Sequence, residues 1–171
     1  MVRFLVLFLV ILLLLFTAEL TPYGQQYVVI PWTDTLARIS AALVLPFDPD
    51  VVSSGKILRS MATGFGISIE AGCNGVEAMI VLIAAVLAYP APWRSRVIGL
   101  VAGFFAIQLL NLVRIISLFY IGQWDKEIFE WAHLYAWQAL IMLDALIVFL
   151  LWLRSLPSDG PATPDKLSVA T

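Results

Sequence analysis

Residues that metal and disulfide chemistry need are almost missing from this sequence. It contains one cysteine and one histidine in 171 residues. A single cysteine excludes an internal disulfide framework and any zinc site built from several cysteines. A single histidine argues against a metal cluster built from histidines. We therefore expect no metal and no organic cofactor.

Charged residues are also scarce, at 13% of the chain, with a net charge of -2 and no basic run. So weak and scattered a charge does not indicate nucleic acid or an acidic ligand as a partner. Hydrophobic residues make up 61% of the chain, whereas a soluble domain is roughly half apolar. The composition predicts an integral membrane protein.

Long apolar runs predict about four transmembrane helices, over residues 3–20, 76–93, 97–121 and 134–153. Each run is about long enough to cross a bilayer. The first run has an alternative as the apolar core of a signal peptide, but no clean small-residue cleavage site follows it, which favours an uncleaved anchor. The predicted fold class is therefore an all-α integral membrane protein.

The segment 21–75, between the first two runs, is predicted to be a small extracytoplasmic insert. Residues 32–45 suit a short amphipathic helix. Apolar residues alternate with others over 65–70, which predicts a strand, with 57–61 as its hairpin partner. We expect one membrane-embedded domain over residues 1–156. The cytoplasmic tail 157–171 is rich in proline and serine and is predicted to be disordered.

Arginines next to the predicted spans set the expected orientation, because basic residues favour the cytoplasmic side. Four of them, Arg3, Arg94, Arg96 and Arg154, fall at the same side of a four-span chain. This places both termini in the cytoplasm, and the insert and the loop 122–132 outside. The expected location is the inner (cytoplasmic) membrane, as a multi-pass protein whose reactive residues face the periplasm.

The three side chains most capable of chemistry then fall in one leaflet. Cys73 precedes the second predicted span and His133 precedes the fourth, both on the outer side. Arg114 lies in the third span, seven residues from its outer end, or roughly 10 Å below the boundary. The loop arginines gave this topology independently of the three reactive residues, so their shared depth supports a common site.

Cys73 is the candidate nucleophile. Gly72 and Gly75 allow a tight backbone around it, and Asn74 is placed to open the next helix. A helix N-terminus lowers the pKa of a thiol and offers N–H groups to an oxyanion. The alternative is a small buried residue at the start of a helix.

Arg114 and His133 are the candidate partners of the cysteine. An arginine inside a span costs at least ~2.5 kcal/mol and is usually functional, and its guanidinium suits an oxyanion. The alternative is a side chain that reaches outward to water. His133 suits a general acid-base, with a polar tip at the membrane surface as its alternative.

Several other polar residues are candidate supports. Asn111 shares the helix face of Arg114 and is predicted to orient it or to donate a hydrogen bond itself. Glu77 is predicted to pair with Arg114 or to orient His133. For Asn111 the alternative is an interhelical hydrogen bond. For Glu77 and Asp144 the alternative is a purely structural pair within the helical bundle. A further prediction places a substrate helix against Gly99 and Gly103.

Together, Cys73-Asn74-Gly75, the run Asn-Leu-Val-Arg that ends at Arg114, and His133 resemble the exosortase and archaeosortase family. The resemblance runs from about residue 55 to 153, and the short chain looks like the compact H-type subgroup. Serine often stands where this chain has Asn74.

The resemblance implies a cysteine transpeptidase that cleaves C-terminal sorting signals of exported proteins. Such a signal consists of a short motif, a transmembrane helix and a basic cluster. The family's reactive trio corresponds to Cys73, Arg114 and His133, with the cysteine forming a thioester that an acceptor resolves. Exported proteins with this signal and membrane lipid are the expected partners.

Three other functions remain open from the residues alone. A non-catalytic assembly factor or transporter subunit would tolerate replacement of Cys73. A plain intramembrane protease would use the same trio with water as the acceptor. An ion-coupled carrier is disfavoured because the four short spans contain no repeat.

Overall fold

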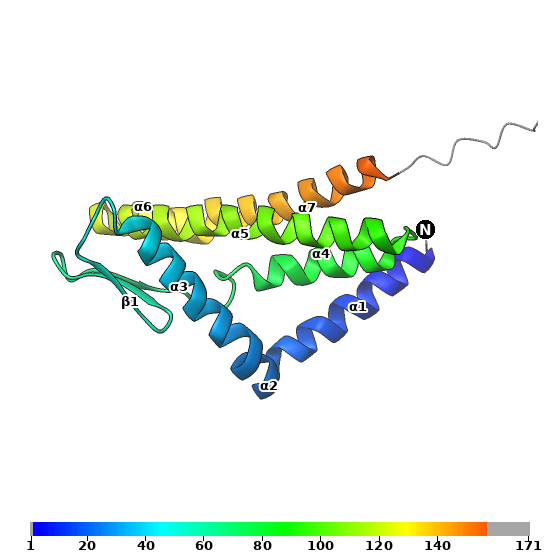
Figure 1. Cartoon of the computed structure of the whole chain (residues 1–171), viewed down its shortest axis with the longest axis horizontal. Coiled ribbons are helices and arrows are strands. Elements are labelled where there is room, and N and C mark those ends of the chain that lie inside the picture. The colour runs from blue at the N-terminus through cyan, green and yellow to red at the C-terminus, as the bar shows by residue number, and fades with distance from the viewer. Residues whose placement is uncertain (1, 157–171) are drawn as a thin grey trace, which may run out of the picture.

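The computed structural model describes residues 2–156, so the predicted disordered tail lies outside the described residues. Helices form the first part of the chain, three strands follow, and helices form the rest (Figure 1). The elements are α1 Val2–Leu20, α2 Pro22–Gly24, the π-helical η1 Gln25–Val29, α3 Ile30–Val44, β1 Val51–Ser54, β2 Ile57–Ser60, β3 Gly66–Ser68, α4 Val76–Ala88, α5 Trp93–Trp124, α6 Lys126–Trp131, the π-helical η2 Ala132–Ala136 and α7 Trp137–Ser155.

Within residues 2–156, three helices are long and apolar enough to cross a membrane: α1, α5, and the continuous helix formed by α6, η2 and α7. The shorter apolar helix α4 packs against all of α1, α5 and α7. The predicted all-α membrane fold is confirmed. The boundary between the second and third spans differs from the prediction, because Pro90 and Pro92 end α4 early and α5 begins at Trp93.

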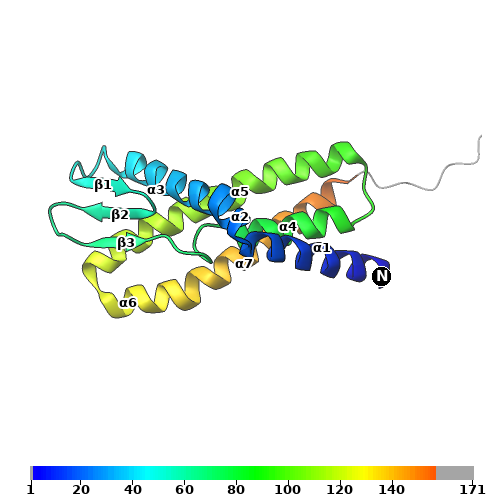
Figure 2. The same ribbon diagram turned by 90° about the horizontal axis from the view of Figure 1, so that it is seen from below.

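The insert folds into helix α3 and a three-stranded antiparallel sheet, in the order β1-β2-β3 (Figure 2). The predicted helix and hairpin are confirmed, with Leu58 opposite Ile67. Strand β1 was not predicted, because its four residues end in two serines and carry little alternation. Leu36, Leu58 and Phe119 are buried where α3 and the sheet meet the end of α5.

A second core joins α4, α5 and α7. A Cβ added to Gly99 would collide with the Trp152 indole, and one added to Gly103 would collide with Leu82. These glycines therefore let neighbouring helices approach within the bundle. The prediction that they receive a substrate helix is wrong, since their faces are already occupied.

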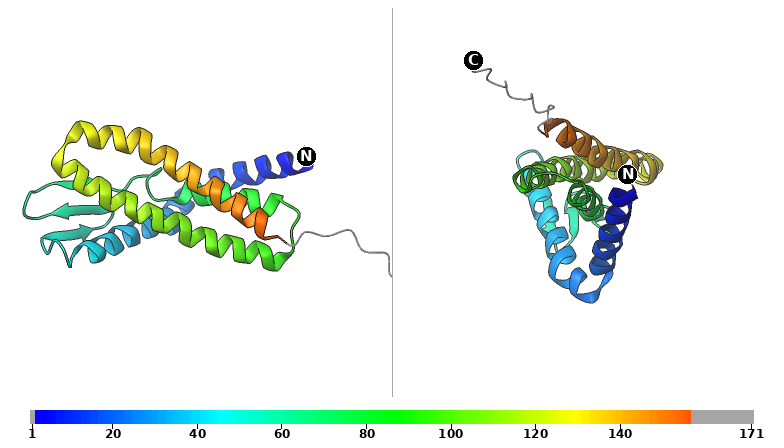
Figure 3. Two further views of the ribbon diagram at one scale, coloured as in Figure 1. Left: turned by 90° about the horizontal axis from the view of Figure 1, so that it is seen from above. Right: turned by 90° about the vertical axis from the view of Figure 1, so that its right-hand side faces the viewer.

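The two ends of the molecule differ in composition. The start of α1 and the end of α7 lie at one end, and the sheet and α6 lie at the other (Figures 1 and 3). The first end carries the arginines that set the predicted orientation. The predicted loop 122–132 is largely helical, because α5 continues to Trp124 and Asp125 caps α6 by accepting a hydrogen bond from the Ile128 N–H at 2.9 Å.

Candidate active site

The loop between β3 and α4 holds Cys73 in a fixed conformation. Gly72 and Gly75 have φ values of 83° and 73°, in the left-handed region that glycine adopts without strain. Between them, Asn74 is fully buried. Its Oδ1 accepts a hydrogen bond from the Val76 N–H at 3.0 Å, and its Nδ2 donates to Thr33 Oγ1 at 3.2 Å. Asn74 therefore fastens the cysteine loop to both α3 and α4.

Arg114 reaches the same loop from α5. Its side chain is only 2% exposed. Nη1 donates to the Gly72 carbonyl at 3.2 Å, and Nη2 lies 3.4 Å from Cys73 Sγ. No ion pair links Arg114 to a carboxylate in residues 2–156. The buried guanidinium thus has the cysteine sulfur, and no acid, beside it.

The predicted contacts of Glu77 with Arg114 or His133 are not formed. The Glu77 carboxylate instead accepts a hydrogen bond from the Gly72 N–H. Glu77 lies in the first turn of α4, and from there its carboxylate turns back onto the loop that precedes the helix. Its contact is with the cysteine loop backbone.

His133 completes the group from the fourth membrane helix. Cys73 Sγ lies 3.9 Å from its Nδ1 and 3.8 Å from its Nε2. The Phe129 ring stacks on the imidazole with a centroid separation of 5.6 Å. His133 belongs to η2, a π-helical turn, a feature that often occurs at functional positions. The structure therefore brings Cys73, Arg114 and His133 together.

The environment of Cys73 raises the pKa of its thiol. Burial is the largest cause, while the Arg114 guanidinium lowers the pKa and Glu77 and Glu70 raise it. The expected lowering by a helix N-terminus is not found. The reason is local: α4 begins only at Val76, and Asn74 already occupies its first N–H group. The resting thiol is neutral and needs a base.

Asn111 is buried, but it does not orient Arg114 as predicted. Neither its Nδ2 nor its Oδ1 has a hydrogen-bond partner among the described residues, and Gln108 Oε1 and Arg114 Nε are also unpaired there. Gln108, Asn111 and Arg114 follow each other at three-residue intervals, so they share one side of α5. Asp144, on α7, keeps an unpaired Oδ2 and forms no ion pair within the described residues.

Three contributors were missed by the sequence reading: Trp32, Thr33 and Phe129. The Trp32 indole N–H donates a hydrogen bond to the Asn74 carbonyl at 3.2 Å. Thr33 Oγ1 accepts a hydrogen bond from the Asn74 side-chain amide, and the Phe129 ring stacks on His133. The four-residue spacing of Phe129 and His133 was the one available signal, since such pairs share a helix face. The contacts of Trp32 and Thr33 span about forty positions and leave no local pattern.

A family model described as Transmembrane exosortase (Exosortase_EpsH) matches residues 2–153. This chain belongs to the transmembrane exosortase family. The match agrees with the resemblance carried by Cys73, Arg114 and His133. Neither the curated proteins nor the solved structures contain a match to this exosortase. Family membership indicates a membrane transpeptidase of the cysteine class that takes part in protein sorting.

Proposed function

We propose that this exosortase cleaves the C-terminal sorting signals of exported proteins at the outer face of the inner membrane and transfers the proteins to an acceptor. Cys73 is the nucleophile, His133 the general acid-base and Arg114 the group that stabilises the oxyanion. One observation carries the proposal: a buried arginine, with no carboxylate partner in residues 2–156, contacts the chain's only cysteine, beside its only histidine.

The lack of a counter-ion for Arg114 among the described residues favours catalysis over a structural role. A buried charge is costly unless an opposite charge compensates it. Thiol attack on a peptide carbonyl creates such a charge, first on sulfur and then on the carbonyl oxygen. A guanidinium that meets this charge only during the reaction stabilises the transition state more than the resting enzyme.

The reaction begins as His133 removes the proton of the Cys73 thiol. Sulfur then attacks the carbonyl carbon of the scissile peptide, and the carbonyl oxygen becomes an oxyanion next to Arg114. The carbon–nitrogen bond breaks as His133 returns its proton to the leaving nitrogen, and a thioester remains on Cys73. An acceptor amine attacks the thioester, loses a proton to His133, and releases the joined product and the thiol.

The neighbourhood of Cys73 suits a substrate that is anchored in the membrane. The cysteine loop lies where the apolar helices α4 and α5 meet the small sheet and α3. A sorting signal places its cleavable peptide just outside its transmembrane helix. A thiol at the boundary between the bundle and the insert matches that depth.

Processing of a reporter in cells tests the proposal. The reporter is an exported protein that ends in a candidate sorting tail from the same genome, expressed with either the wild-type exosortase or Cys73→Ala. We expect the wild type to shorten the reporter and Cys73→Ala to leave it full-length while accumulating equally in the membrane. Equal processing by both variants would exclude Cys73 as the nucleophile.

The mass of the released N-terminal product distinguishes transfer from hydrolysis. Transfer adds the mass of the acceptor to the new C-terminus, whereas hydrolysis leaves a free carboxylate. We expect an added mass. If all of the product carried a free carboxylate, the enzyme would be a plain protease and not a transpeptidase. The roles of Cys73, Arg114 and His133 would be unchanged.

A further inference from the structure

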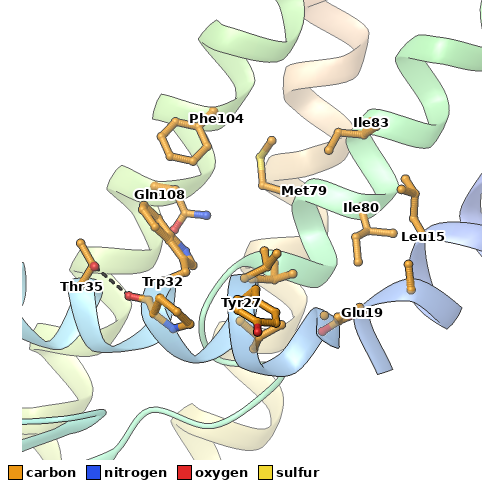
Figure 4. Close-up of a pocket in the computed structure, with 16 residues that line it drawn as sticks. Leu15, Glu19, Tyr27, Trp32, Thr35, Met79, Ile80, Ile83, Phe104 and Gln108 are labelled. Atoms are coloured by element: carbon orange, nitrogen blue, oxygen red, sulfur yellow. Dashed lines mark hydrogen bonds between the residues drawn. The ribbon is translucent and has the colours of Figure 1, made fainter. Parts of the chain in front are cut away.

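An apolar cavity of about 670 Å³ lies between α1, η1, α3, α4 and α5 (Figure 4). Its walls include Trp32 from α3, Ile83 from α4 and Phe104 from α5. On one side Tyr27 and Val28 of η1 are largely exposed. The cavity is therefore an apolar recess where the insert meets the helical bundle, close to the surface of the molecule.

The cavity begins next to the cysteine loop and extends away from it along α4. Trp32, which lines it, donates to the carbonyl of Asn74, the residue after Cys73. Four residues of α4 line it at helical spacing, one face over two turns: Val76, Met79, Ile80 and Ile83. A segment bound in this recess would continue directly from a peptide held at Cys73.

Two side chains with acceptor oxygens, Gln108 and Glu19, line this otherwise apolar space. Gln108 lines the cavity and is 6% exposed, and its Oε1 has no hydrogen-bond partner among the described residues. Figure 4 shows its amide directed between Trp32 and Met79. Glu19, 8% exposed, is the one carboxylate lining the cavity, and it forms no ion pair in residues 2–156. Buried acceptors without partners point to a donor on a ligand.

The N-terminal end of a transmembrane helix supplies such donors. Its first four N–H groups have no partner within the helix, and its dipole makes that end positive. In a bilayer these groups need acceptors. A phospholipid acyl chain would suit the apolar walls but offers no N–H group to Gln108 or Glu19.

We propose that this cavity receives the first turns of the substrate's anchor helix, with Gln108 accepting a hydrogen bond from one of its free backbone N–H groups. The inference rests on the proposed function, since a C-terminal anchor whose cleavable bond lies outside the membrane presents its helix N-terminus next to Cys73. The carboxyl group of Glu19, which also lines the cavity, offers a second acceptor at that end of the helix.

Photo-crosslinking of the full chain tests the docking site. The photoreactive residue benzoylphenylalanine replaces Ile83 in the Cys73→Ala variant, which keeps the reporter uncleaved. The matched control replaces Leu143, which lies on α7, is 49% exposed and lines no cavity described above. We expect an adduct with the reporter's anchor helix from position 83 and none from position 143.

A second variant tests the role of Gln108. Gln108→Met keeps a similar volume and removes the amide, whereas Gln108→Glu retains an acceptor. We expect Gln108→Met to reduce the adduct from position 83 about fivefold to tenfold, the effect of one lost hydrogen bond, and Gln108→Glu to restore most of it. Adduct is normalised to the amount of exosortase in the membrane.

An adduct from position 83 with lipid alone would overturn the docking site and assign the cavity to an acyl chain. Equal adducts from positions 83 and 143 would overturn it as well, as would an unchanged adduct in Gln108→Met. Cleavage by the wild type is scored separately. Intact cleavage without the adduct overturns only the docking site, and an adduct without cleavage overturns only the proposed function.

Discussion

At the scale of single residues, the unusual feature is a positive charge buried next to a thiol whose pKa is raised. In a site that holds a resting thiolate, a nearby cation lowers the pKa of the thiol by more than burial raises it, as in reactive cysteines of low pKa. Here burial outweighs the effect of Arg114 on Cys73. The guanidinium therefore acts when substrate binding and proton transfer to His133 create negative charge.

Replacement of Arg114 is expected to slow the reaction more than it alters the fold. Arg114→Lys keeps the charge but loses the forked geometry that joins Gly72 and Cys73. We expect reporter cleavage to fall by about 10²-fold to 10³-fold, the usual cost of a lost oxyanion donor. Arg38→Lys, at an exposed position on α3, is the control. Full activity in Arg114→Lys would contradict this role.

The pH dependence of Cys73 alkylation measures the same electrostatics without a substrate. Because the pKa of the Cys73 thiol is raised, a smaller fraction of it is thiolate at neutral pH. An ordinary cysteine has a pKa of about 8.5. The rate of Cys73 alkylation by iodoacetamide should therefore rise at a higher pH than that of an ordinary cysteine. Arg114 lowers this pKa, so Arg114→Gln is expected to move the profile to still higher pH. Mass spectrometry reports the single cysteine. A profile that Arg114→Gln left in place would disprove the contact.

At the scale of elements, the sequence predicts some of the features that build the site and gives no sign of others. The spans follow from apolar runs, and the left-handed turn around Cys73 follows from two glycines. The π-helical turn that carries His133 has no comparable sequence signal, and neither has the contact between Asn74 and Thr33. The glycines of α5 were visible, but their neighbours Trp152 and Leu82 come from helices whose packing the sequence does not specify.

The bond between Asn74 and Thr33 is expected to couple α3 to the start of α4. Asn74→Ala removes both the cap on Val76 and the donor to Thr33, so it should lower the free energy of unfolding by about 1–3 kcal/mol. Thr33→Val removes the acceptor of this bond, together with the hydrogen bond that Thr33 Oγ1 donates to the Val29 carbonyl at 2.7 Å. Denaturant unfolding in detergent should show the two changes to be non-additive by about 0.5 kcal/mol or more.

Ser155→Ala supplies the control for this cycle. The Ser155 hydroxyl donates to the Trp152 carbonyl at the far end of α7 and shares no partner with Asn74. Its effect should add to that of Asn74→Ala within about 0.3–0.5 kcal/mol. Additivity between Asn74→Ala and Thr33→Val as well would mean that the hydrogen bond does not join the two helices.

At the scale of the whole molecule, reactive residues and loop arginines lie toward opposite ends. The sheet and α6 lie at one end, and the arginine-bearing ends of α1, α5 and α7 lie at the other (Figure 1). The loop that carries Cys73 leads from β3 of the sheet into α4. Exposed tryptophans mark both, with Trp93 at 66% and Trp124 at 83%. Indole side chains favour the membrane surface, so the intervening stretch of α5 is suited to the bilayer core.

The arginines at one end of the molecule predict which side of the membrane holds the active site. In a Cys73→Ala background, Lys126→Cys places the only thiol near the start of α6, and Arg94→Cys places it near the start of α5. A membrane-impermeant maleimide added to cells with a permeable outer envelope should label Lys126→Cys and spare Arg94→Cys until the membrane is lysed. The positive-inside rule supplies the direction, because Arg94 shares its end with Arg3 and Arg154. Labelling of Arg94→Cys alone in intact cells would invert the topology, and cleavage of signals would then have to occur on the cytoplasmic side.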